Sequence, residues 1–545
     1  MSLREAVIKE LLNVMREDLK EICESKAYRN TTLVILNPSK VCDLTRIMKE
    51  KFDARLSHEF ALEDELGFRV YYVYDLSFME RHLHLIAMTR ISRGETIPSI
   101  APVTEEALWA EREYAELLGI SYVNHPDGEK LRHQFLPHEW PDVPEKGSWV
   151  TTPRPYGAYS ILPFGPYHPA LLEAAYFRVL AEGETVLDID IKTGFNHRGI
   201  MKLAEKRDYH KALHLCTRVC GICNAAHAQT YVNAVENLLG IEVPERAKYI
   251  RVLADELNRI HSHLLYFGVE SYLAGFETLF MLSFRYREEV MDAIELLSGN
   301  RVLMDIHDIG GVRRDVSDEA LTKIRGRLRS LREAVEKFIG MLQEHRVLRA
   351  RMEDIGVLRV ADAKRAGAVG PTARGSGWRI DVRHDSPCEV YGEVSWEVIT
   401  DEGKDVLSRT MVRLREVLVS IGICEQCLEA LQRVKGPVKL EDMPSPETGA
   451  EGMGLYEAPR GELFYYVVSD GSPNPYAVRI RTPSYRNMYV LKYMVPGYEL
   501  ADVPVIIGSI DPCLACTDRI QVIDVKRGEI RYYSIRELRR HNRIT

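Results

Sequence analysis

Two Cys-x-x-Cys pairs near opposite ends of the sequence constrain the fold more than any other feature. RVCGIC contains Cys220 and Cys223, and DPCLAC contains Cys513 and Cys516. Cys220 and Cys513 are 293 residues apart, so a shared metal would require the fold to close a very long loop. Each pair also stands beside a charged residue. Either the pairs meet around a metal or they are unrelated.

Paired cysteines in a chain of this size are more often metal ligands or redox groups than parts of a disulfide framework. The chain has ten cysteines in 545 residues. Four thiolates suit zinc, iron–sulfur clusters or nickel, and zinc is the commonest outcome for such spacing. The sequence therefore predicts a shared site of four thiolates from the two outer pairs and leaves the metal open.

The residues around the outer pairs favour this interpretation. Arg218 and Arg519 would offset part of the negative charge of four thiolates. His227 lies one helical turn beyond Cys223, from where an imidazole can hydrogen-bond a sulfur ligand. Pro512 keeps the backbone ahead of the second pair out of a helix.

A third pair, Cys424 and Cys427, lies in SIGICEQCLEALQRV, which is a strongly helical sequence. Two cysteines at positions i and i+3 of a helix commonly serve as small apolar residues. We therefore expect both cysteines to be buried residues of a helix. Whether they have a further role stays open.

The composition is that of an ordinary globular protein, with 46% hydrophobic and 28% charged residues and a net charge of −8. No region is strongly basic, which argues against a nucleic-acid partner. No apolar run approaches the ~18 to 20 residues that a membrane-spanning helix needs. The N-terminus is charged and has no apolar signal region. We expect a cytoplasmic protein, held at a membrane only through partner subunits.

Residues 1–140 read as a small α/β domain. A helix is predicted at its start, two β-type runs at 69–78 and 81–91 suit a hairpin, and 105–120 is a helical stretch. Residues 141–163 are rich in proline, which removes backbone donors and disfavours helices. We interpret them as a linker into a second domain.

Residues 164–519 read as a mainly helical domain with peripheral β segments, which makes the fold class α+β. Apolar residues recur at intervals of three and four from Ile250 to Phe267, and again from Leu321 to Phe338 behind the good N-cap residue Ser317. After residue 350 the pattern changes to shorter β-type and loop segments, including 370–383 and 461–470. The two helices predict a bundle core.

The two cysteine motifs, RVCGICNAAH and DPCLACTDR, resemble those of [NiFe]-hydrogenase large subunits. A third segment, EAPRGEL, resembles the loop that presents an arginine over the metal site in that family. GPYHPALLEAAYFRVLAEGE and GPTARGSGWRIDVR are similar to the 49 kDa subunit of respiratory NADH:quinone oxidoreductase, and EREYAELLGISYVNHPD is similar to its 30 kDa subunit. The fusion, with four cysteines, resembles the membrane-bound energy-converting hydrogenases (group 4), especially the formate hydrogenlyase type.

The resemblance implies a nickel–iron centre in which all four cysteines bind nickel. Cys223 and Cys516 would bridge to an iron that carries cyanide and carbon monoxide, and Cys220 and Cys513 would be terminal ligands. The implied activity is the interconversion of hydrogen with protons and electrons, most often as hydrogen evolution.

Further site residues follow from the same resemblance. Arg460, preceded by Pro459, would lie above the open position of the centre, where it could act on hydrogen or only hold a cyanide. His227 and Asp511 would lie beside the ligands. Glu173 would relay protons with the Cys513 thiolate, unless it is a surface or helix-capping acid.

The resemblance also implies partners. An iron–sulfur small subunit would deliver electrons, because this chain has too few spare cysteines for clusters of its own. Membrane subunits would translocate protons or other ions, and an electron-donor module would contain formate dehydrogenase, carbon monoxide dehydrogenase or ferredoxin. A maturation endopeptidase would remove residues 520–545 by a cut after Arg519; a permanent C-terminal strand and helix is the alternative.

Two other functions remain to be weighed. A fused subunit of NADH:quinone oxidoreductase would share the fold. Its quinone site, however, requires a tyrosine near the place where this chain has Leu215 and Gly221. His168, in GPYHP, would then be the element common to both and structural here. A non-catalytic protein with a four-thiolate zinc site is the second alternative, and it leaves Arg460 unexplained.

Overall fold

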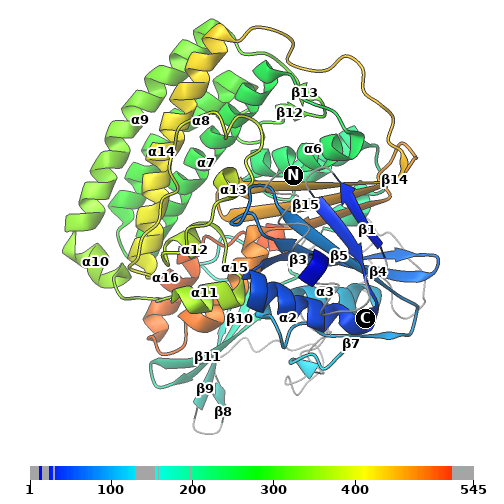
Figure 1. Ribbon diagram of the computed structural model, residues 1–545. Coiled ribbons are helices and arrows are strands. Elements are labelled where there is room, and N and C mark those ends of the chain that lie inside the picture. The colour runs from blue at the N-terminus through cyan, green and yellow to red at the C-terminus, as the bar shows by residue number, and fades with distance from the viewer. Residues whose placement is uncertain are drawn as a thin grey trace, which may run out of the picture.

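The computed structural model shows an α+β protein in which a helical bundle lies beside two sheets (Figure 1). The predicted opening helix is described only at its helical residues 12–14, and much of the predicted linker and all of the tail lie outside the described part of the chain. The described residues are 12–14, 24–28, 31–128, 154–156, 159–196 and 198–517.

The N-terminal region is built on a five-stranded sheet with the strand order β1-β2-β5-β4-β3. β2 and β5 pair in parallel and the other neighbours are antiparallel, so the predicted hairpin of β4 and β5 is confirmed. The helix predicted at 105–120 is α3, with a 3₁₀ turn at Glu105–Ala107 before it. The elements are β1 Glu24–Tyr28, β2 Thr31–Ile35, α2 Val41–Phe52, β3 Arg55–Asp64, β4 Gly67–Asp75, β5 His84–Ile91 and α3 Leu108–Leu118.

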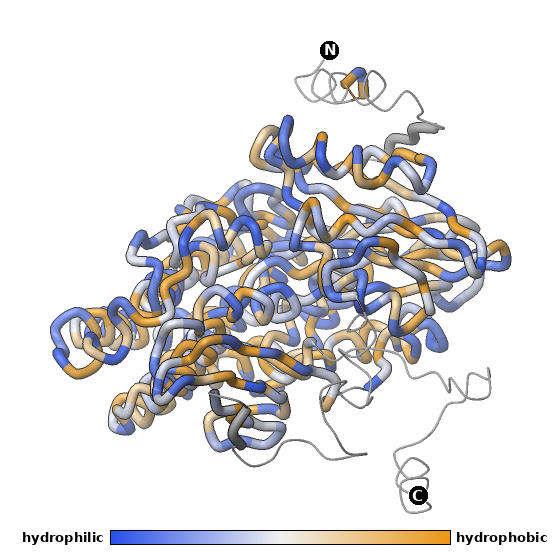
Figure 2. Tube along the Cα trace, turned by 90° about the horizontal axis from the view of Figure 1, so that it is seen from below, coloured by the Kyte–Doolittle hydropathy of each residue, from blue (hydrophilic) through white to orange (hydrophobic). Residues whose placement is uncertain are grey.

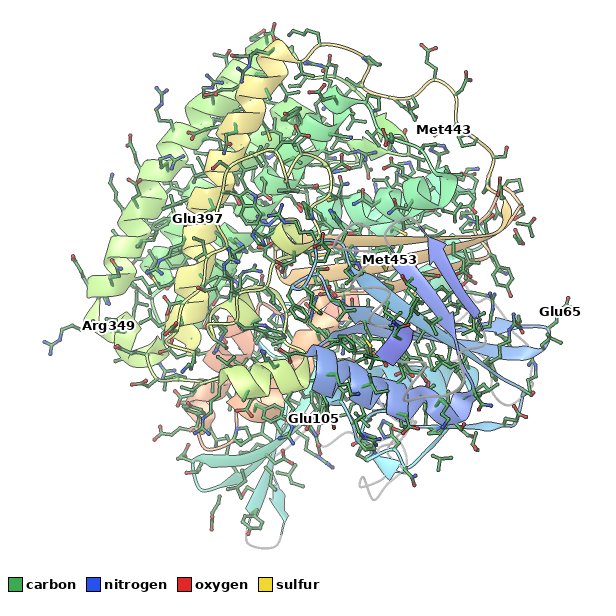
Figure 3. The ribbon with its side chains drawn as sticks, in the orientation of Figure 1. Glu65, Glu105, Arg349, Glu397, Met443 and Met453 are labelled. Atoms are coloured by element: carbon green, nitrogen blue, oxygen red, sulfur yellow. The ribbon has the colours of Figure 1, made fainter. Side chains whose placement is uncertain are left out.

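Four long helices form the bundle at the upper left of Figure 1. The two predicted apolar stripes are confirmed, because every one of their residues is buried, and Ser317 caps α9 by accepting a hydrogen bond from the Ala320 backbone N–H at 3.2 Å. By contrast, the charged side chain of Arg349 is exposed and projects away from the molecule (Figure 3). The helices are α7 Glu245–Leu273, α8 Glu277–Ser298, α9 Asp318–Glu344 and α14 Val406–Arg433.

Helix α7 differs from an amphipathic surface helix because its charged side is buried as well. Arg251 pairs with Glu236 at 2.6 Å, and its other nitrogen pairs with Glu389 at 2.8 Å. Buried charges persist only when they are paired and hydrogen-bonded. Helix α7 is therefore surrounded by other elements of the domain, with both its apolar and its charged residues buried.

A three-stranded sheet of β14 Thr448–Ala458, β15 Gly461–Asp470 and β16 Ala477–Arg481 lies between α6 Asn224–Leu239 and the N-terminal sheet (Figure 1). A Cβ added at Gly454 would lie 2.1 Å from the carbonyl oxygen of Thr230 on α6. Only glycine permits this close approach of strand and helix.

The N-terminal sheet shares a core with the β14–β16 sheet. Phe60 lies between Tyr71, at 4.8 Å between ring centroids, and Tyr466, also at 4.8 Å. At the same contact the Glu462 carboxylate accepts hydrogen bonds from Ser57, at 2.5 Å, and from Arg55 and Arg481. Figure 2, seen from below, shows hydrophobic and hydrophilic residues alternating along the elements, as expected when each has a buried side.

Two sequence predictions need correction. Within 141–163, residues 154–156 are strand β8 and 159–164 are strand β9, which pair with β10 Tyr176–Glu182 and β11 Thr185–Lys192 in one sheet. β8 is the edge strand, a position that tolerates proline.

The segment 370–383 contains the short helices α12 Gly370–Arg374 and α13 Val382–Asp385 and no strand, because Pro371 favours the first turn of a helix.

No helix among the described residues combines the length and apolarity needed to cross a membrane.

The contact between the two regions generates a stability prediction. Glu462→Ala should lower the free energy of unfolding by about 3 to 5 kcal/mol, because it leaves the buried Arg481 guanidinium without its charge partner and removes one of the two carboxylates that pair with Arg55. The measurement is the midpoint of urea denaturation. Arg93→Ala, which removes an exposed ion pair with Glu63, is the matched control and should cost at most about 1 kcal/mol. Equal midpoints for the two variants would contradict the prediction.

Candidate metal centre

The structure brings the two outer cysteine pairs together. Cys220 Sγ lies 3.5 Å from Cys513 Sγ, and the sulfurs of Cys220, Cys513 and Cys516 all lie within 4.8 Å of one another. Cys223 Sγ, a nitrogen of His227 and Cys516 Sγ form a second group within the same limit. All four cysteines are at most 3% exposed.

Local backbone structure explains how the two loops present their thiols. The first pair follows α5 Tyr209–Thr217, and Cys223 is the N-cap residue of α6. The second pair follows α16 Val503–Ser509, where Asp511 takes the left-handed conformation with φ of 53°. A left-handed residue turns the chain sharply, so the segment leaves the helix axis and enters the interior.

Arg198 joins the two cysteine loops, which sequence reasoning missed. Its guanidinium donates to the carbonyl oxygens of Arg218 at 2.6 Å and Val219 at 2.8 Å in the first loop. It also donates to the carbonyl oxygen of Ala515 in the second loop at 3.0 Å. The residue lies in GFNHRGIM, and nothing in its local pattern points to this contact.

Arg218 does not play the expected part. Its guanidinium forms a two-pronged ion pair with Asp305, at 2.6 and 2.7 Å, and its charge is thereby already balanced. Arg519 lies outside the described residues. The interpretation that these two arginines offset the thiolates is therefore wrong for Arg218 and undecided for Arg519.

Arg460 supplies the cation instead. It lies with Pro459 in the two-residue turn between β14 and β15. Its Nε donates to the Asp511 carbonyl oxygen at 2.6 Å, and Nη2 donates to the Asp511 carboxylate at 2.7 Å. Its Nη1 donates to Ser262 Oγ at 3.3 Å. Buried beside Asp511 and the thiols, the guanidinium keeps its charge, and those negative neighbours raise its pKa against the desolvation by burial.

Gly370 allows this turn to lie deep in the molecule. A Cβ at Gly370 would lie 2.3 Å from the Arg460 carbonyl oxygen, and the residue has a φ of +65°. Any larger residue would clash with the turn and strain its own backbone. Gly370 therefore helps to support the arginine turn, whereas 370–383 was predicted only as one of the β-type and loop segments.

The thiols form a strongly coupled cluster. Sulfur hydrogen bonds from Cys223, Cys513 and Cys516 hold the pKa of the Cys220 thiol well below its usual range. The pKa of the Cys513 thiol is raised, chiefly by its hydrogen bond to Cys220. The cluster therefore concentrates negative charge on one sulfur unless a cation compensates all four. Four buried soft donors next to a guanidinium fit a soft divalent metal.

His227 lies between the cluster and a tyrosine. Its Nε2 is 3.6 Å from Cys516 Sγ, and its Nδ1 is 2.7 Å from the Tyr465 hydroxyl. The sequence predicted the contact of His227 with a sulfur from helical spacing, but it carried no signal for Tyr465 on β15. A partner at the second ring nitrogen fixes the orientation of an imidazole.

Glu173 lies at the second cysteine loop. One carboxylate oxygen accepts a hydrogen bond from the Ala515 backbone N–H at 2.6 Å. Burial raises the pKa of the Glu173 carboxyl, and the nearby Cys220 thiolate raises it further. The group is therefore both a cap for the loop and an acid near the thiols, so the two interpretations of Glu173 are compatible.

The third cysteine pair lies elsewhere. Cys424 and Cys427 are buried on α14, and burial raises the pKa of both thiols. Neither belongs to a group of metal-ligand type among the described residues. The prediction that this pair is core is consistent with that position.

Comparison with known families divides the chain into three matching parts. Residues 274–453 and 441–519 match "Respiratory-chain NADH dehydrogenase, 49 Kd subunit". Residues 198–272 match "Nickel-dependent hydrogenase", and residues 34–153 match "Respiratory-chain NADH dehydrogenase, 30 Kd subunit". The hydrogenase match thus covers the first cysteine pair and most of α7.

Individual relatives agree with this division. The chain is 35% identical to formate hydrogenlyase subunit 5 of Escherichia coli, over 82% of this chain and 81% of the relative. It is 40% identical to membrane-bound hydrogenase subunit alpha of Pyrococcus furiosus, over 68% of this chain and 89% of the relative. A chain in the solved structure of the archaeal membrane-bound sulfane sulfur reductase is 34% identical, with a TM-score of 0.63 over 66% of this chain and 98% of that chain.

The link between the cysteine loops gives a testable prediction. Arg198→Ala should lower the amount of metal bound per chain by roughly tenfold, because it releases three carbonyl oxygens that hold the loops in register. Metal analysis of the purified protein measures this. Arg207→Ala serves as the control, because it removes an exposed guanidinium that donates to the carbonyl oxygen of the neighbouring Lys206. Equal metal content in both variants would show that the loops hold their register without Arg198.

Proposed function

Because this chain belongs to the large subunits of membrane-bound [NiFe]-hydrogenases of group 4, with a fused 30 kDa-like region, we propose that its buried four-cysteine cluster is where hydrogen is interconverted with protons and electrons. One observation carries the proposal. Thiols from two loops 293 residues apart meet in the interior beside a guanidinium that is fixed by Asp511.

The donor set fits a nickel–iron centre. Cys220, Cys223, Cys513 and Cys516 would hold the nickel, together with an iron that carries cyanide and carbon monoxide. The centre supplies the redox chemistry at which dihydrogen is split or formed. The chain's own contribution is to hold four thiolates, exclude water and supply one positive charge.

Arg460 would orient and polarise whatever occupies the open side of the centre. Its three hydrogen bonds to Asp511 and Ser262 leave little freedom of rotation, so the charge is in place before any reaction. Preorganised charge in a buried site stabilises developing charge without reorganisation. A free guanidinium is a poor base. The fixed contacts of Arg460 with Asp511 and Ser262 therefore favour an electrostatic role for this residue. The environment of the cysteine ligands would be formed in part by His227, Asp511 and Pro459.

Glu173 would exchange protons with the Cys513 thiolate. Burial raises its pKa, which suits a group that must both accept and release a proton. In hydrogen evolution the carboxyl would give its proton toward the sulfur, and in hydrogen oxidation it would take that proton away.

The chain is a subunit of a multisubunit membrane-bound complex. We propose that an iron–sulfur small subunit exchanges electrons with the site and that membrane subunits translocate protons or other ions. Formate dehydrogenase, carbon monoxide dehydrogenase or ferredoxin would supply the electrons. A maturation endopeptidase would remove residues 520–545 once the metal is in place, leaving the 164–519 domain as the mature catalytic part.

The two alternatives explain less. A fused subunit of NADH:quinone oxidoreductase accounts for the fold but gives no role to four buried thiols that meet. A zinc protein accounts for the thiols but needs no buried Arg460 paired with Asp511.

Arg460→Lys should keep the metal content and lower hydrogen turnover by roughly 10²- to 10³-fold, because an ammonium cannot make the three directed bonds of the guanidinium. The assay is hydrogen evolution from a chemical electron donor by the purified complex. Arg433→Lys, at the exposed last turn of α14, is the control. Turnover equal to that of the control would remove Arg460 from the mechanism.

Cys516→Ser should abolish hydrogen turnover and lower nickel content, because a hydroxyl is a much poorer ligand for soft metals than a thiolate. Cys427→Ser, on α14, should retain nickel. Full hydrogen turnover in the Cys516 variant would refute the proposed function.

A further inference from the structure

A second acidic side chain shares a cavity with Glu173. The cavity has a volume of about 30 Å³ and lies between α7, the loop around Glu173 and the start of the second cysteine loop. Its walls are apolar except for Glu173, Tyr266, Glu270 and Asp511. About 10 to 15 Å³ suffices for one water molecule, so the cavity has room for one or two with polar partners at hand.

Glu270 lies near the C-terminal end of α7 and is 1% exposed. Neither of its carboxylate oxygens has a hydrogen-bond partner among the described residues. Leaving a buried polar group unsatisfied is costly, and such groups in native proteins have a reason, such as a bound water or a functional role. Glu270 is one of the residues that line the cavity with room for water.

The surroundings shift the pKa of the Glu270 carboxyl to about 8. Burial is the largest cause and raises the pKa, Arg413 and Arg409 on α14 lower it, and Asp511 makes a smaller contribution that raises it. Arg409 is engaged by Ser509 at 3.0 Å, and Arg413 lies over the Tyr266 ring at 4.1 Å. Neither guanidinium donates a hydrogen bond to Glu270, so no hydrogen bond from α14 stabilises its charged form.

We propose that Glu270 is the proton-relay residue that follows Glu173, and that water in their shared cavity connects the two carboxyl groups. The proposal rests on the proposed function and extends it from Glu173 to the second carboxyl group of the cavity. Leu172, which also lines the cavity, is 65% exposed, so the wall of the cavity beside Glu173 lies at the protein surface.

The transfer is balanced and moves no electron. During hydrogen evolution the O–H bond of Glu270 breaks as its proton passes to a cavity water. That water forms an O–H bond to the Glu173 carboxylate with another of its protons. Glu270 regains a proton from solvent through water in the cavity. Hydrogen oxidation runs the same steps in reverse.

The test uses the complete complex, purified with its maturation system intact. Glu270→Gln should lower hydrogen evolution at least about tenfold, with nickel and iron content unchanged, and should increase the solvent deuterium isotope effect on the rate. Glu270→Asp, which keeps an ionisable carboxyl, should restore most of the rate. Asp255→Asn is the matched control: it neutralises another buried acid of α7, whose pKa burial also raises, outside the cavity.

A second readout does not depend on turnover. The infrared difference spectrum of the wild-type complex minus Glu270→Gln should contain the band of one protonated carboxyl, and this band should be lost as the pH rises through about 8. A Cβ at Gly508 would lie 2.4 Å from Glu270 Oε2, so Gly508→Ala should shift this band without removing the acid.

The outcomes separate the two proposals. A Glu270→Gln complex with the wild-type rate and isotope effect would overturn the relay and leave the hydrogenase function standing. A wild-type complex that evolves no hydrogen would refute the proposed function first. Should Glu270→Gln fail to assemble, an unshifted carboxyl band in Gly508→Ala would overturn the placement of Glu270 in the cavity.

Discussion

The pairing of Arg460 with Asp511 joins the parts of the site that come from distant segments. Arg460 lies on the turn of the β14–β15 hairpin, and Asp511 leads the second cysteine loop into the interior. Both the carbonyl and the carboxylate of Asp511 accept from the same guanidinium. In a buried environment such charge-assisted bonds are strong and directional. The position of the second thiol pair and the position of the cation are therefore set by one contact.

The rest of the fold maintains this contact from outside. Gly370 leaves room for the arginine turn, Gly454 lets α6 lie directly on β14, and Glu462 ties the hairpin to the N-terminal sheet. Helix α7 then supplies Ser262 to the guanidinium on one turn and Glu270 to the neighbouring cavity two turns later. One buried helix thus serves the cysteine cluster and the proposed proton route together.

The sequence allowed the local elements to be predicted where one physical signal dominates. Apolar spacing located α7 and α9, and the Ser317 cap located the start of α9. The meeting of the cysteine pairs was also anticipated, although the metal and the ligand roles came from family resemblance and not from spacing. The buried charges of α7 were missed, because their partners, such as Glu389, come from segments that periodicity cannot place. Arg198 and Tyr465 were missed for the same reason, and Arg218 was misassigned because Asp305 is remote in sequence.

The most direct test of the central claim is made on the complex purified without oxygen from a host with its maturation system. Nickel, iron and zinc are measured per chain, and the infrared spectrum is recorded where metal-bound cyanide and carbon monoxide absorb. The account predicts about one nickel and one iron per chain beyond the clusters of partner subunits, together with those bands. Zinc alone, with no such bands, would contradict it and would mean that the cysteine loops meet around a structural metal.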